Sequence, residues 1–589
     1  MRLFSDEAVQ GFIADGWWSG DTWGDLFRRN VGRFPDRECL VDAPNKALYL
    51  GREPRRLTWG ALDAAVDRCA EVFFLHGIRE GDVVGIQIPN SVELAITYLA
   101  LNRLGAVLSP YPVAYRRHEI GQLARIAGAR TIVTTAGFSS RDLREDVSAV
   151  LEALDAPGGP GDLFIWEDGV AGAGTALDLD DVLRGPRGNN EYEAYVRSLR
   201  PHPNDCAIIL FTSGTTGTPK GVPRAHGDSL VSASATVASP GLTFRDVVLC
   251  PMPMVNGGSI TGMFLPWLLT GYRLVMHQPF DVEVYAAQIE AESVTYSVAP
   301  PTILNDMVAD DGIFARYDLS SLRILGSGSA PLSGWMIKRW ESDHGVEIIN
   351  FFGATEGVQL FADADSVPDP ALRGRCLPMP GSPLFRWRTE VGRRGSSRLV
   401  DLETGQDITE PGVAGELRVK GPNIFSGYLH RADDTFDEQG YFRTGDIFER
   451  SAAVEDMLIL VDRAKDLIIR GGMNISAPEI ESLLVAHPKV AQVAAVGRAD
   501  IRLGERTCVF VVPTDRNAPP TLRDLLDYLN DGGVATFKLP ESMELIDHLP
   551  RNPAGKVLKA ELRAMINGND GRAVPAVRRY PALAARNGA

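Results

Sequence analysis

Apolar positions recur at helical spacing in two stretches near the start of the chain. Residues 57–77 (LTWGALDAAVDRCAEVFFLHG) and residues 91–110 (SVELAITYLALNRLGAVLSP) each carry apolar side chains three and four positions apart, with a glycine where the helical pattern stops. Between them, residues 82–88 (DVVGIQI) form a short run rich in β-branched side chains. Strands that alternate with helices in this way predict an α/β architecture with a mostly parallel sheet.

The pattern loosens over residues 138–204, where DAPGGPGD and GVAGAGTALD are typical of a surface insertion. Residues 206–212 (CAIILFT) then predict a buried strand that leads into a loop rich in Gly and Thr. Residues 321–333 (SLRILGSGSAPLS) repeat this arrangement of a strand followed by a glycine-rich turn. Residues 412–428 are β-rich with turn glycines, and they predict a small β subdomain.

A chain of 589 residues is too long for one core, so we expect at least two domains. The patterns predict a large N-terminal domain at residues 1–464, in which mixed and parallel sheets pack with helices and a β subdomain covers about 385–460. A smaller α+β C-terminal domain is expected at residues 465–567. Residues 568–589 are rich in Ala, Arg and Pro, and we expect this tail to be poorly ordered.

Composition narrows the class of protein only slightly. Hydrophobic residues make up 44% of the chain and charged residues 23%, as in ordinary globular enzymes. The formal net charge of -16 argues against a nucleic-acid binder that works by general phosphate neutralisation. Small anionic ligands remain compatible with it, because a local group of Lys and Arg side chains can bind them on an acidic protein.

The cysteines are scattered, and no two have the spacing of a CxxC metal or redox motif. We therefore expect reduced thiols in the core. No basic region followed by an apolar region opens the sequence, and no apolar run reaches ~18 residues, so we expect a cytoplasmic protein without a membrane span. The cysteines are Cys39, Cys69, Cys206, Cys250, Cys376 and Cys508.

The loop after the buried strand, LFTSGTTGTPKG at residues 210–221, has the chemistry of a phosphate cradle. It combines backbone N–H groups, hydroxyl donors and a lysine, with glycines that permit close approach. It is not a Walker loop, because Pro219 stands where the second glycine belongs. A flexible surface turn is the alternative interpretation. The candidate phosphate-binding residues are Thr212, Ser213, Gly214, Thr215, Thr216, Gly217 and Lys220.

This loop resembles the phosphate-loop signature of the adenylate-forming (ANL) superfamily, which contains acyl-CoA and aryl-CoA ligases, stand-alone adenylation enzymes and luciferases. The resemblance implies that the loop holds the β- and γ-phosphates of ATP while a carboxylate attacks the α-phosphorus. It also implies a large N-terminal domain and a mobile C-terminal domain. Further motifs of the family follow in family order between about residues 57 and 565.

Two of these motifs lie in the N-terminal part. NFFGATEG at residues 350–357 resembles the family's aromatic-Gly-x-Thr-Glu segment, with Phe352 where many members have tyrosine. The resemblance implies that Glu356 coordinates Mg²⁺, that Thr355 contacts the α-phosphate, and that Phe352 and Gly353 lie against adenine. GSGSAPLS at residues 326–333 resembles the loop beside the adenine. The residues implied there are Gly326 at the acid pocket and Gly328, Ser329 and Ala330 at the base.

The remaining motifs lie near or beyond the predicted domain boundary. YFRTGD at residues 441–446 resembles the ribose motif and implies that Asp446 binds the ribose hydroxyls. DRAKDLIIRGG at residues 462–472 resembles the hinge segment, and LPRNPAGKVLK at residues 549–559 resembles the segment of the catalytic lysine. The residues implied are Arg463 at the ribose, Lys465 as the hinge, Gly471 and Gly472 at the coenzyme A tunnel, and Lys556 as the catalytic lysine.

The reaction implied by the resemblance has two steps. ATP and a carboxylic acid first give an acyl-adenylate and pyrophosphate, with Mg²⁺ as cofactor. A swing of the C-terminal domain about Lys465 then admits a thiol. We expect coenzyme A as this co-substrate, with the phosphopantetheine thiol of a separate carrier protein as the alternative. A non-catalytic nucleotide-binding relative is the remaining hypothesis, and His226 is expected to be structural.

The chain departs from the family pattern after CPMPM. Many relatives have an aromatic residue and a histidine where this chain has Val255 and Asn256. Asn256 either bonds a polar group of the acid or fills space, and Gly257 belongs to a glycine-rich stretch that leaves room for a bulky acid. No acidic residue is present there to hold an α-amino group, so a non-amino acid is expected. An aromatic or polycyclic acid and a medium-chain acid both remain open.

Overall fold

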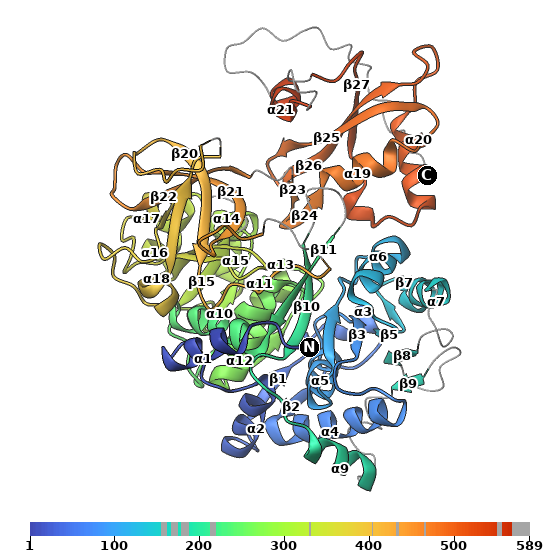
Figure 1. Ribbon diagram of the computed structural model, residues 1–589, viewed down its shortest axis with the longest axis vertical. Helices are drawn as coiled ribbons and strands as arrows, with labels where there is room; N and C mark the ends of the chain where they lie inside the picture. Colours follow the sequence, from blue (N-terminus) through green and yellow to red (C-terminus); the bar gives the residue numbers. More distant parts are fainter. Residues whose placement is uncertain are drawn as a thin grey trace. The chain divides into compact units, whose positions relative to one another are not determined.

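The computed structural model describes residues 1–154, 162–166, 175–177, 188–212, 219–328, 332–402, 404–430, 435–463, 467–550 and 557–567. The chain forms two compact units. Unit 1 comprises Met1–Thr212 and Lys220–Ala464, and unit 2 comprises Ser213–Pro219 and Lys465–Ala589. Unit 1 has several sheets and unit 2 has one (Figure 1). Each unit also has a hydrophobic core of its own.

A seven-stranded sheet of unit 1 carries the strand that leads into the Gly/Thr-rich loop. All neighbouring strands are parallel except β10 and β11, which form an antiparallel pair at one edge. The predicted alternation of helix and strand is confirmed here, because α5 and α6 separate the parallel strands β3, β4 and β5. In order across the sheet, the strands are β11 (Lys220–Ala225), β10 (Cys206–Thr212), β4 (Val107–Pro110), β3 (Val83–Gln87), β5 (Thr131–Thr135), β8 (Leu163–Trp166) and β9 (Thr175–Leu177).

An eight-stranded sheet carries the glycine-rich turn and the Thr-Glu segment. Its six central strands are parallel, and an antiparallel strand closes each edge. In order, the strands are β17 (Gln359–Ala362), β16 (Glu347–Gly353), β15 (Ile324–Gly328), β14 (Tyr296–Val298), β12 (Val247–Cys250), β13 (Arg273–Met276), β1 (Glu38–Val41) and β2 (Arg56–Thr58).

A third sheet of unit 1 is antiparallel throughout, and the β-rich residues 412–428 contribute one of its strands. Segments at residues 401–413 and 451–456 connect β19 to β20 and β21 to β22, so strands that are consecutive in the chain are also neighbours in this sheet. Its strands, in order, are β18 (Cys376–Pro378), β22 (Met457–Arg463), β21 (Phe442–Arg450), β20 (Ala414–Lys420) and β19 (Ser396–Val400), and a separate small hairpin consists of β6 (Gly137–Phe138) and β7 (Arg141–Asp142).

Helices pack on the sheets of unit 1, and each of its main hydrophobic clusters contains residues of both. Trp59 of α4 stacks on Trp267 of α12 with ring centroids 4.8 Å apart, which joins segments distant in sequence. The helices are α1 (Asp6–Ala14), α2 (Trp23–Arg33), α3 (Lys46–Leu50), α4 (Trp59–Leu75), α5 (Val92–Arg103), α6 (Arg117–Ala127), α7 (Leu143–Ala153), α9 (Asn190–Ser198), α10 (His226–Ala238), α11 (Gly257–Ser259), the π-helix η1 (Ile260–Phe264), α12 (Leu265–Thr270), α13 (Val282–Glu292), α14 (Pro301–Ala309), α15 (Asp311–Arg316), α16 (Gly334–His344), α17 (Pro370–Arg373) and α18 (Glu390–Arg394).

Unit 2 contains one sheet with helices and a separate core. Strand β27 pairs in parallel with β26, and the other strand pairs are antiparallel. The elements are β23 (Leu467–Arg470), β24 (Met473–Ser476), α19 (Ala477–Leu484), β25 (Val490–Asp500), β26 (Gly504–Pro513), α20 (Leu522–Asp531), the 3-10 turn η2 (Thr536–Lys538), β27 (Ser542–Leu545) and α21 (Lys559–Asn567).

The prediction that residues 138–204 form a loose surface insertion is wrong for most of the part that is described. Strand β8 lies fully buried in the seven-stranded sheet, and helix α7 packs its apolar side against the same core. Their apolar runs are short and lie between Gly-rich stretches, so the sequence pattern underestimates the burial that pairing with β5 provides. Residues 155–161, 167–174 and 178–187 lie outside the described residues.

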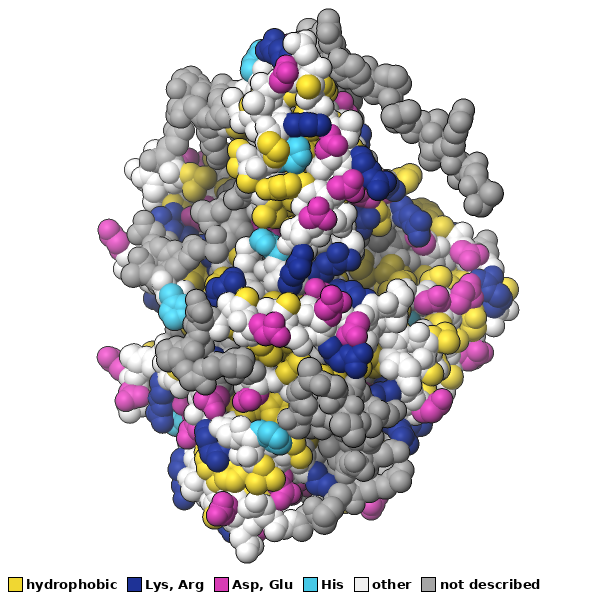
Figure 2. Space-filling model, turned by 90° about the vertical axis from the view of Figure 1, so that its right-hand side faces the viewer, with side chains coloured by type: hydrophobic (Ala, Val, Ile, Leu, Met, Phe, Trp, Pro, Cys, Tyr) yellow, Lys and Arg dark blue, Asp and Glu magenta, His cyan; other side chains and the backbone are white. Residues whose placement is uncertain are grey.

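The cysteine prediction is confirmed, because all six thiols are free and buried. Over the described ranges, no helix has the length and apolarity needed to cross a bilayer. On the face seen in Figure 2, Lys and Arg side chains lie interspersed with Asp and Glu side chains. The net negative charge is therefore not gathered in one block on that face.

Candidate functional site

The β10–β11 hairpin presents the ends of the phosphate-loop motif. Thr212 closes β10 and pairs with Lys220, the first residue of β11, so the intervening loop starts and ends at adjacent positions of the sheet. Both side chains are half-buried. The predicted loop residues Ser213, Gly214, Thr215, Thr216 and Gly217 lie outside the described residues.

The Thr-Glu segment forms the turn between β16 and β17. Gly353 pairs with Gln359 across this turn, and the Ala354 N–H donates to the Val358 carbonyl. Thr355 and Glu356 occupy its tip, where Thr355 is half-buried and Glu356 is 2% exposed. A hairpin turn at the edge of the sheet thus places a hydroxyl and a carboxylate next to each other.

Tyr428 joins this turn to the phosphate-loop hairpin. Its hydroxyl donates to Glu356 Oε1 over 2.6 Å, and the Lys220 ammonium lies 4.3 Å from the centre of its ring. The Leu429 N–H also donates to the Gly221 carbonyl over 2.9 Å. Lys220 and Glu356, which the motifs suggest separately, therefore meet around one tyrosine that the sequence reasoning missed.

Arg224 is a second residue that the sequence reasoning missed. It lies on β11 four residues after Lys220, is 2% exposed, and donates from Nη1 to the Thr355 carbonyl over 2.7 Å. Its Nε lies 3.2 Å from Asp228 Oδ2. Burial raises the pKa of Asp228 to about 7, although Arg224 opposes this shift. No motif marks Arg224, because its partners come from distant parts of the chain.

The turn also fits against the loop at residues 421–428. Gly357 has φ +106°, and a Cβ atom there would collide with the Asn423 carbonyl, so the turn requires glycine at this position. In return, Asn423 Nδ2 donates to the Gly357 carbonyl over 2.7 Å, and the Phe425 N–H donates to the Glu356 carbonyl over 2.9 Å.

The predicted ribose residues are cross-strand partners in the antiparallel sheet. Asp446 of β21 pairs with Arg463 of β22, and Asp446 is 6% exposed. Two residues further along β21, Phe448 packs edge-on against the predicted adenine neighbour Phe352, with centroids 5.1 Å apart. Phe352, Gly353 and Asp446 are therefore drawn from two sheets that meet here.

The two glycines at the end of β15 have a packing role that the sequence did not reveal. A Cβ atom at Gly326 would collide with the Phe351 ring, and one at Gly328 would collide with the Phe351 carbonyl. Both glycines therefore allow β15 to approach β16 closely. Ser329 and Ala330 lie outside the described residues.

Asn256 and Gly257 lie beside the Thr-Glu turn. A Cβ atom at Gly257 would be 3.3 Å from the Thr355 side chain. Asn256 is the N-cap of α11, but its exposed side chain makes no capping hydrogen bond. Asparagine at this position usually caps the helix with its side chain, so the Asn256 amide is available to another partner.

The segment that leads to Asn256 is held by α5 and the residues before it. Asn90 is 1% exposed, donates to the Met252 carbonyl over 2.8 Å and accepts from the Met254 N–H over 2.7 Å. The Tyr98 hydroxyl donates to the Met254 carbonyl over 2.7 Å. These bonds fix the backbone immediately before Asn256.

In unit 2, Gly471 and Gly472 form the exposed turn between β23 and β24, with φ of +55° and +82°. Positive φ at both central residues is typical of a tight two-residue hairpin turn. The predicted hinge Lys465 and the predicted catalytic Lys556 lie outside the described residues.

Mg²⁺ is usually held by one or two carboxylates together with substrate phosphates. In the described ranges, no three His, Cys, Asp or Glu side chains are grouped to hold a metal by themselves. Glu356 fits the usual pattern as a single carboxylate, since Tyr428 bonds Oε1 and no described residue bonds Oε2.

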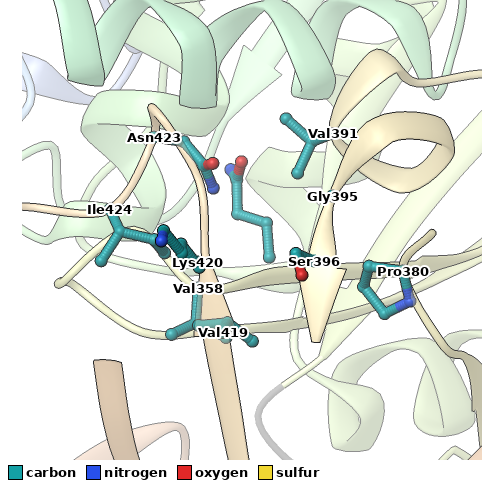
Figure 3. Close-up of a pocket in the computed structure, with 10 residues that line it drawn as sticks. Val358, Pro380, Val391, Gly395, Ser396, Val419, Lys420, Asn423 and Ile424 are labelled. Atoms are coloured by element: carbon teal, nitrogen blue, oxygen red, sulfur yellow. The ribbon is translucent and has the colours of Figure 1, made fainter. Parts of the chain in front are cut away.

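A separate pocket, with about 270 Å³ of empty space including its open mouth, lies between β17, β19 and β20 (Figure 3). Apolar side chains line it together with Lys420 and Asn423. None of the predicted site residues lines this pocket, although Asn423, which bonds the Gly357 carbonyl, borders both the pocket and the candidate site.

The chain is similar in sequence to known proteins over most of its length. The family model described as AMP-binding enzyme matches residues 27–429, and the model for the AMP-binding enzyme C-terminal domain matches residues 479–556. The 2,3-dihydroxybenzoate-AMP ligase of Bacillus subtilis (strain 168) is 30% identical over 574 residues, which cover 95% of this chain and 97% of the relative. The 4-coumarate-CoA ligase 1 of Narcissus pseudonarcissus is 28% identical over 556 residues, covering 91% and 92%.

A solved structure, that of Mycobacterium smegmatis MbtA in its apo form, superposes with a TM-score of 0.65. It is 27% identical in sequence, and the match covers 96% of this chain and 98% of that one. The predicted architecture, with a large N-terminal part of sheets and helices and a smaller C-terminal part, is thus confirmed at the level of the fold.

Proposed function

The chain belongs to the AMP-binding enzyme family, whose members are adenylate-forming, and from this premise we propose that it activates a carboxylic acid with ATP. A carboxylate oxygen attacks the α-phosphorus, the bond from that phosphorus to the bridging oxygen breaks, and pyrophosphate leaves with its electron pair. The observation that carries this proposal is the meeting of Lys220, Glu356 and Tyr428, with Thr355 directly before Glu356 in the same turn.

The described residues supply positioning and charge for this step, which is what phosphoryl transfer chiefly needs from a protein. Lys220 is placed to neutralise the departing phosphates, and Glu356 to hold Mg²⁺, which would supply positive charge beside the phosphates. Asp446 and Phe352 are proposed to hold the nucleoside. Thr355 is proposed to donate to the α-phosphate. Lys556, from the motif alone, is proposed as the second cation.

The acid is proposed to be aromatic and to carry a hydroxyl or similar polar group near its carboxylate. Two observations support this choice. The Asn256 side chain is exposed, makes no capping bond and lies next to Gly257, where an added Cβ atom would be 3.3 Å from the Thr355 side chain. The two relatives described above are also named for aromatic acids, 2,3-dihydroxybenzoate and 4-coumarate.

The acceptor of the acyl group is proposed to be the thiol of coenzyme A. A relative named 4-coumarate-CoA ligase 1 supports it, as does the exposed Gly471–Gly472 turn, which allows a ligand chain to lie close to the backbone. Transfer to a carrier-protein thiol is the second candidate. It is favoured by a relative from Mycobacterium tuberculosis named salicyl-AMP ligase / salicyl-S-ArCP synthetase, which is 29% identical over 570 residues.

The test is ATP–pyrophosphate exchange with a panel of acids that includes 2-hydroxybenzoate, benzoate, medium-chain acids and amino acids. We expect exchange with 2-hydroxybenzoate to exceed that with benzoate. Asn256→Ala should lower kcat/KM for 2-hydroxybenzoate about tenfold, the value of one hydrogen bond, and leave benzoate nearly unchanged. Exchange with amino acids alone, or with no acid, would contradict the proposal.

The same reactions, supplied with coenzyme A or with a phosphopantetheinylated carrier protein, decide the acceptor. Mass detection of the acyl thioester identifies which thiol is used. Acyl-CoA formation is expected, and acylation of the carrier protein alone would replace the first acceptor with the second.

A further inference from the structure

Arg224 belongs to none of the sequence motifs, yet its side chain makes four hydrogen bonds. Its guanidinium is buried and has four partners on three segments of unit 1. These partners are the Thr355 carbonyl at 2.7 Å, the Asn423 carbonyl at 2.9 Å, Ser232 Oγ at 3.1 Å and Asp228 Oδ2 at 3.2 Å.

The two carbonyls belong to the parts that surround Glu356. The Thr355 carbonyl is part of the peptide that links Thr355 to Glu356, so its position sets the orientation of both side chains. Asn423 belongs to the loop that also bonds the Gly357 carbonyl and, five residues later, supplies Tyr428 to the Glu356 carboxylate. One guanidinium thus holds the turn and its supporting loop together.

Arg224 itself lies on β11, the strand that follows the phosphate loop. Its Ser232 and Asp228 contacts lie on α10, which follows that strand directly. Asp228 is fully buried and fixes Nε, which leaves both Nη groups directed at the carbonyls. A planar guanidinium can serve both carbonyls at once, whereas a lysine ammonium at the end of a flexible stem cannot match that geometry.

We propose that Arg224 is a positioning residue for adenylation. It fixes the position of the Thr355–Glu356 turn relative to β11, the strand that begins at Lys220. The inference rests on the proposed function, since it assigns the turn to the nucleotide. Its consequence is that the distance between the Lys220 ammonium and the Glu356 carboxylate is set by Arg224 and not by either motif alone.

The test compares Arg224→Lys with Arg373→Lys in the full chain. Arg373 is 1% exposed and donates to the carbonyls of Val367, Ile348 and Pro368, away from the Thr355–Glu356 turn. Its variant therefore measures the general effect of replacing a buried arginine that binds carbonyl groups. Pyrophosphate exchange is measured with the acid that the wild type activates best, over a range of Mg²⁺ concentrations.

Arg224→Lys should lower kcat about 10- to 100-fold, the effect of misplacing reacting groups by a fraction of an ångström to one ångström. The KM for the acid should stay within about threefold, because Asn256 is untouched. The Mg²⁺ concentration for half-maximal rate should rise, since Glu356 is displaced. Arg373→Lys should lower the melting temperature without moving the Mg²⁺ dependence.

Binding of a non-hydrolysable ATP analogue, measured by calorimetry at several Mg²⁺ concentrations, tests the inference without turnover. If the wild type shows no exchange with any acid, the proposed adenylation fails, and this binding experiment still decides the role of Arg224. An unchanged Mg²⁺ dependence in Arg224→Lys, or an equal change in Arg373→Lys, would overturn the inference.

Asp228→Asn at pH 8 serves as the second variant if Arg224→Lys does not fold. It keeps an oxygen facing Nε but removes the charge, so the Mg²⁺ dependence should shift in the same direction by about twofold or more. Absence of that shift would likewise overturn the inference.

Discussion

Gly257 and Gly258 are consecutive in the chain, but an added side chain would have more room at Gly258 than at Gly257. A Cβ atom at Gly257 would lie 3.3 Å from the Thr355 side chain, whereas none of the atoms around Gly258 comes within 4 Å of such a Cβ. Neither glycine has positive φ, so alanine is compatible with the backbone at both positions. The pair therefore separates contact with Thr355 from the general effect of adding a methyl group.

Gly257→Ala is expected to displace Thr355 by a few tenths of an ångström and to lower the rate of adenylate formation about tenfold. Gly258→Ala should leave that rate nearly unchanged and act only on the size of the acid accepted. Pyrophosphate exchange with a small and a bulky acid measures both effects. Equal losses in the two variants would mean that Thr355 is not the group affected.

The buried side chain of His226 predicts that the free energy of unfolding depends on pH. It is 5% exposed, its Nδ1 accepts from the Trp23 N–H, and burial lowers its pKa to about 4. In the unfolded chain, a histidine takes up a proton near its ordinary pKa of 6.5. Between these values only the unfolded state is protonated, so stability falls as the pH is lowered.

The wild type should therefore lose about 2 kcal/mol of unfolding free energy between pH 7 and pH 5 relative to His226→Asn, which cannot titrate. Tryptophan fluorescence in urea is a suitable measure, since all nine tryptophans, Trp17 to Trp387, belong to unit 1. Parallel pH profiles for the two proteins would show that His226 is not buried in its neutral form.

The candidate site was predictable from sequence only where its residues are consecutive. Thr355 and Glu356 adjoin within one motif, and Lys220 closes another. Tyr428 and Arg224 were missed because their bonds to this turn span 72 and 131 positions, and no spacing rule reaches that far. The packing of Gly326 against Phe351 was missed for the same reason, since it depends on the pairing of β15 with β16.

At the scale of elements, the short helix α3 is joined to α5 by a buried ion cluster. Lys46 begins α3, is 0% exposed, and places its ammonium 2.6 Å from Asp42 and 2.8 Å from Glu93. Asp42 directly follows β1, and Glu93 lies in the first turn of α5. A strand end and two helix starts therefore meet at one cation.

Lys46→Met should destabilise unit 1 by about 3–5 kcal/mol, because it leaves Asp42 buried without its cation and leaves Glu93 with Arg52 alone, 3.5 Å away. Arg197→Met is the control, since Arg197 is 69% exposed and its pair with Glu193 on α9 is worth at most about 0.5 kcal/mol. Urea unfolding followed by fluorescence gives both values. A loss below about 1 kcal/mol for Lys46→Met would show that the cluster relaxes or admits water.

Elements with a clear periodic or β-branched pattern were predictable, and some short ones were not. Helix α4 covers Trp59–Leu75 within the predicted stretch 57–77, and strand β10 matches the predicted run at Cys206–Thr212. By contrast, the four residues of β8 carry too little pattern to distinguish a core strand from a loop. The π-helix η1 after Asn256 was also beyond prediction, since its longer repeat depends on tertiary contacts.

At the scale of the whole molecule, residues before α2 connect distant parts of unit 1. The Phe4 N–H donates to Asn204 Oδ1, and Trp18 Nε1 donates to the Pro422 carbonyl over 3.2 Å. Pro422 directly precedes Asn423, so this first segment supports the loop that holds the Glu356 turn. Phe4, Phe12 and Trp18 pack together at its centre.

The long reach of Trp18 sets an order of events during synthesis of the chain. The Pro422 carbonyl that it bonds lies 404 residues later in the chain. At the usual rate of about 5–20 residues per second, the ribosome needs roughly 20 to 80 s to make that partner. During this interval the aromatic cluster of Phe4, Phe12 and Trp18 also lacks Phe361 and Val391, which pack in the same core cluster, so its burial is completed only after most of unit 1 has been made.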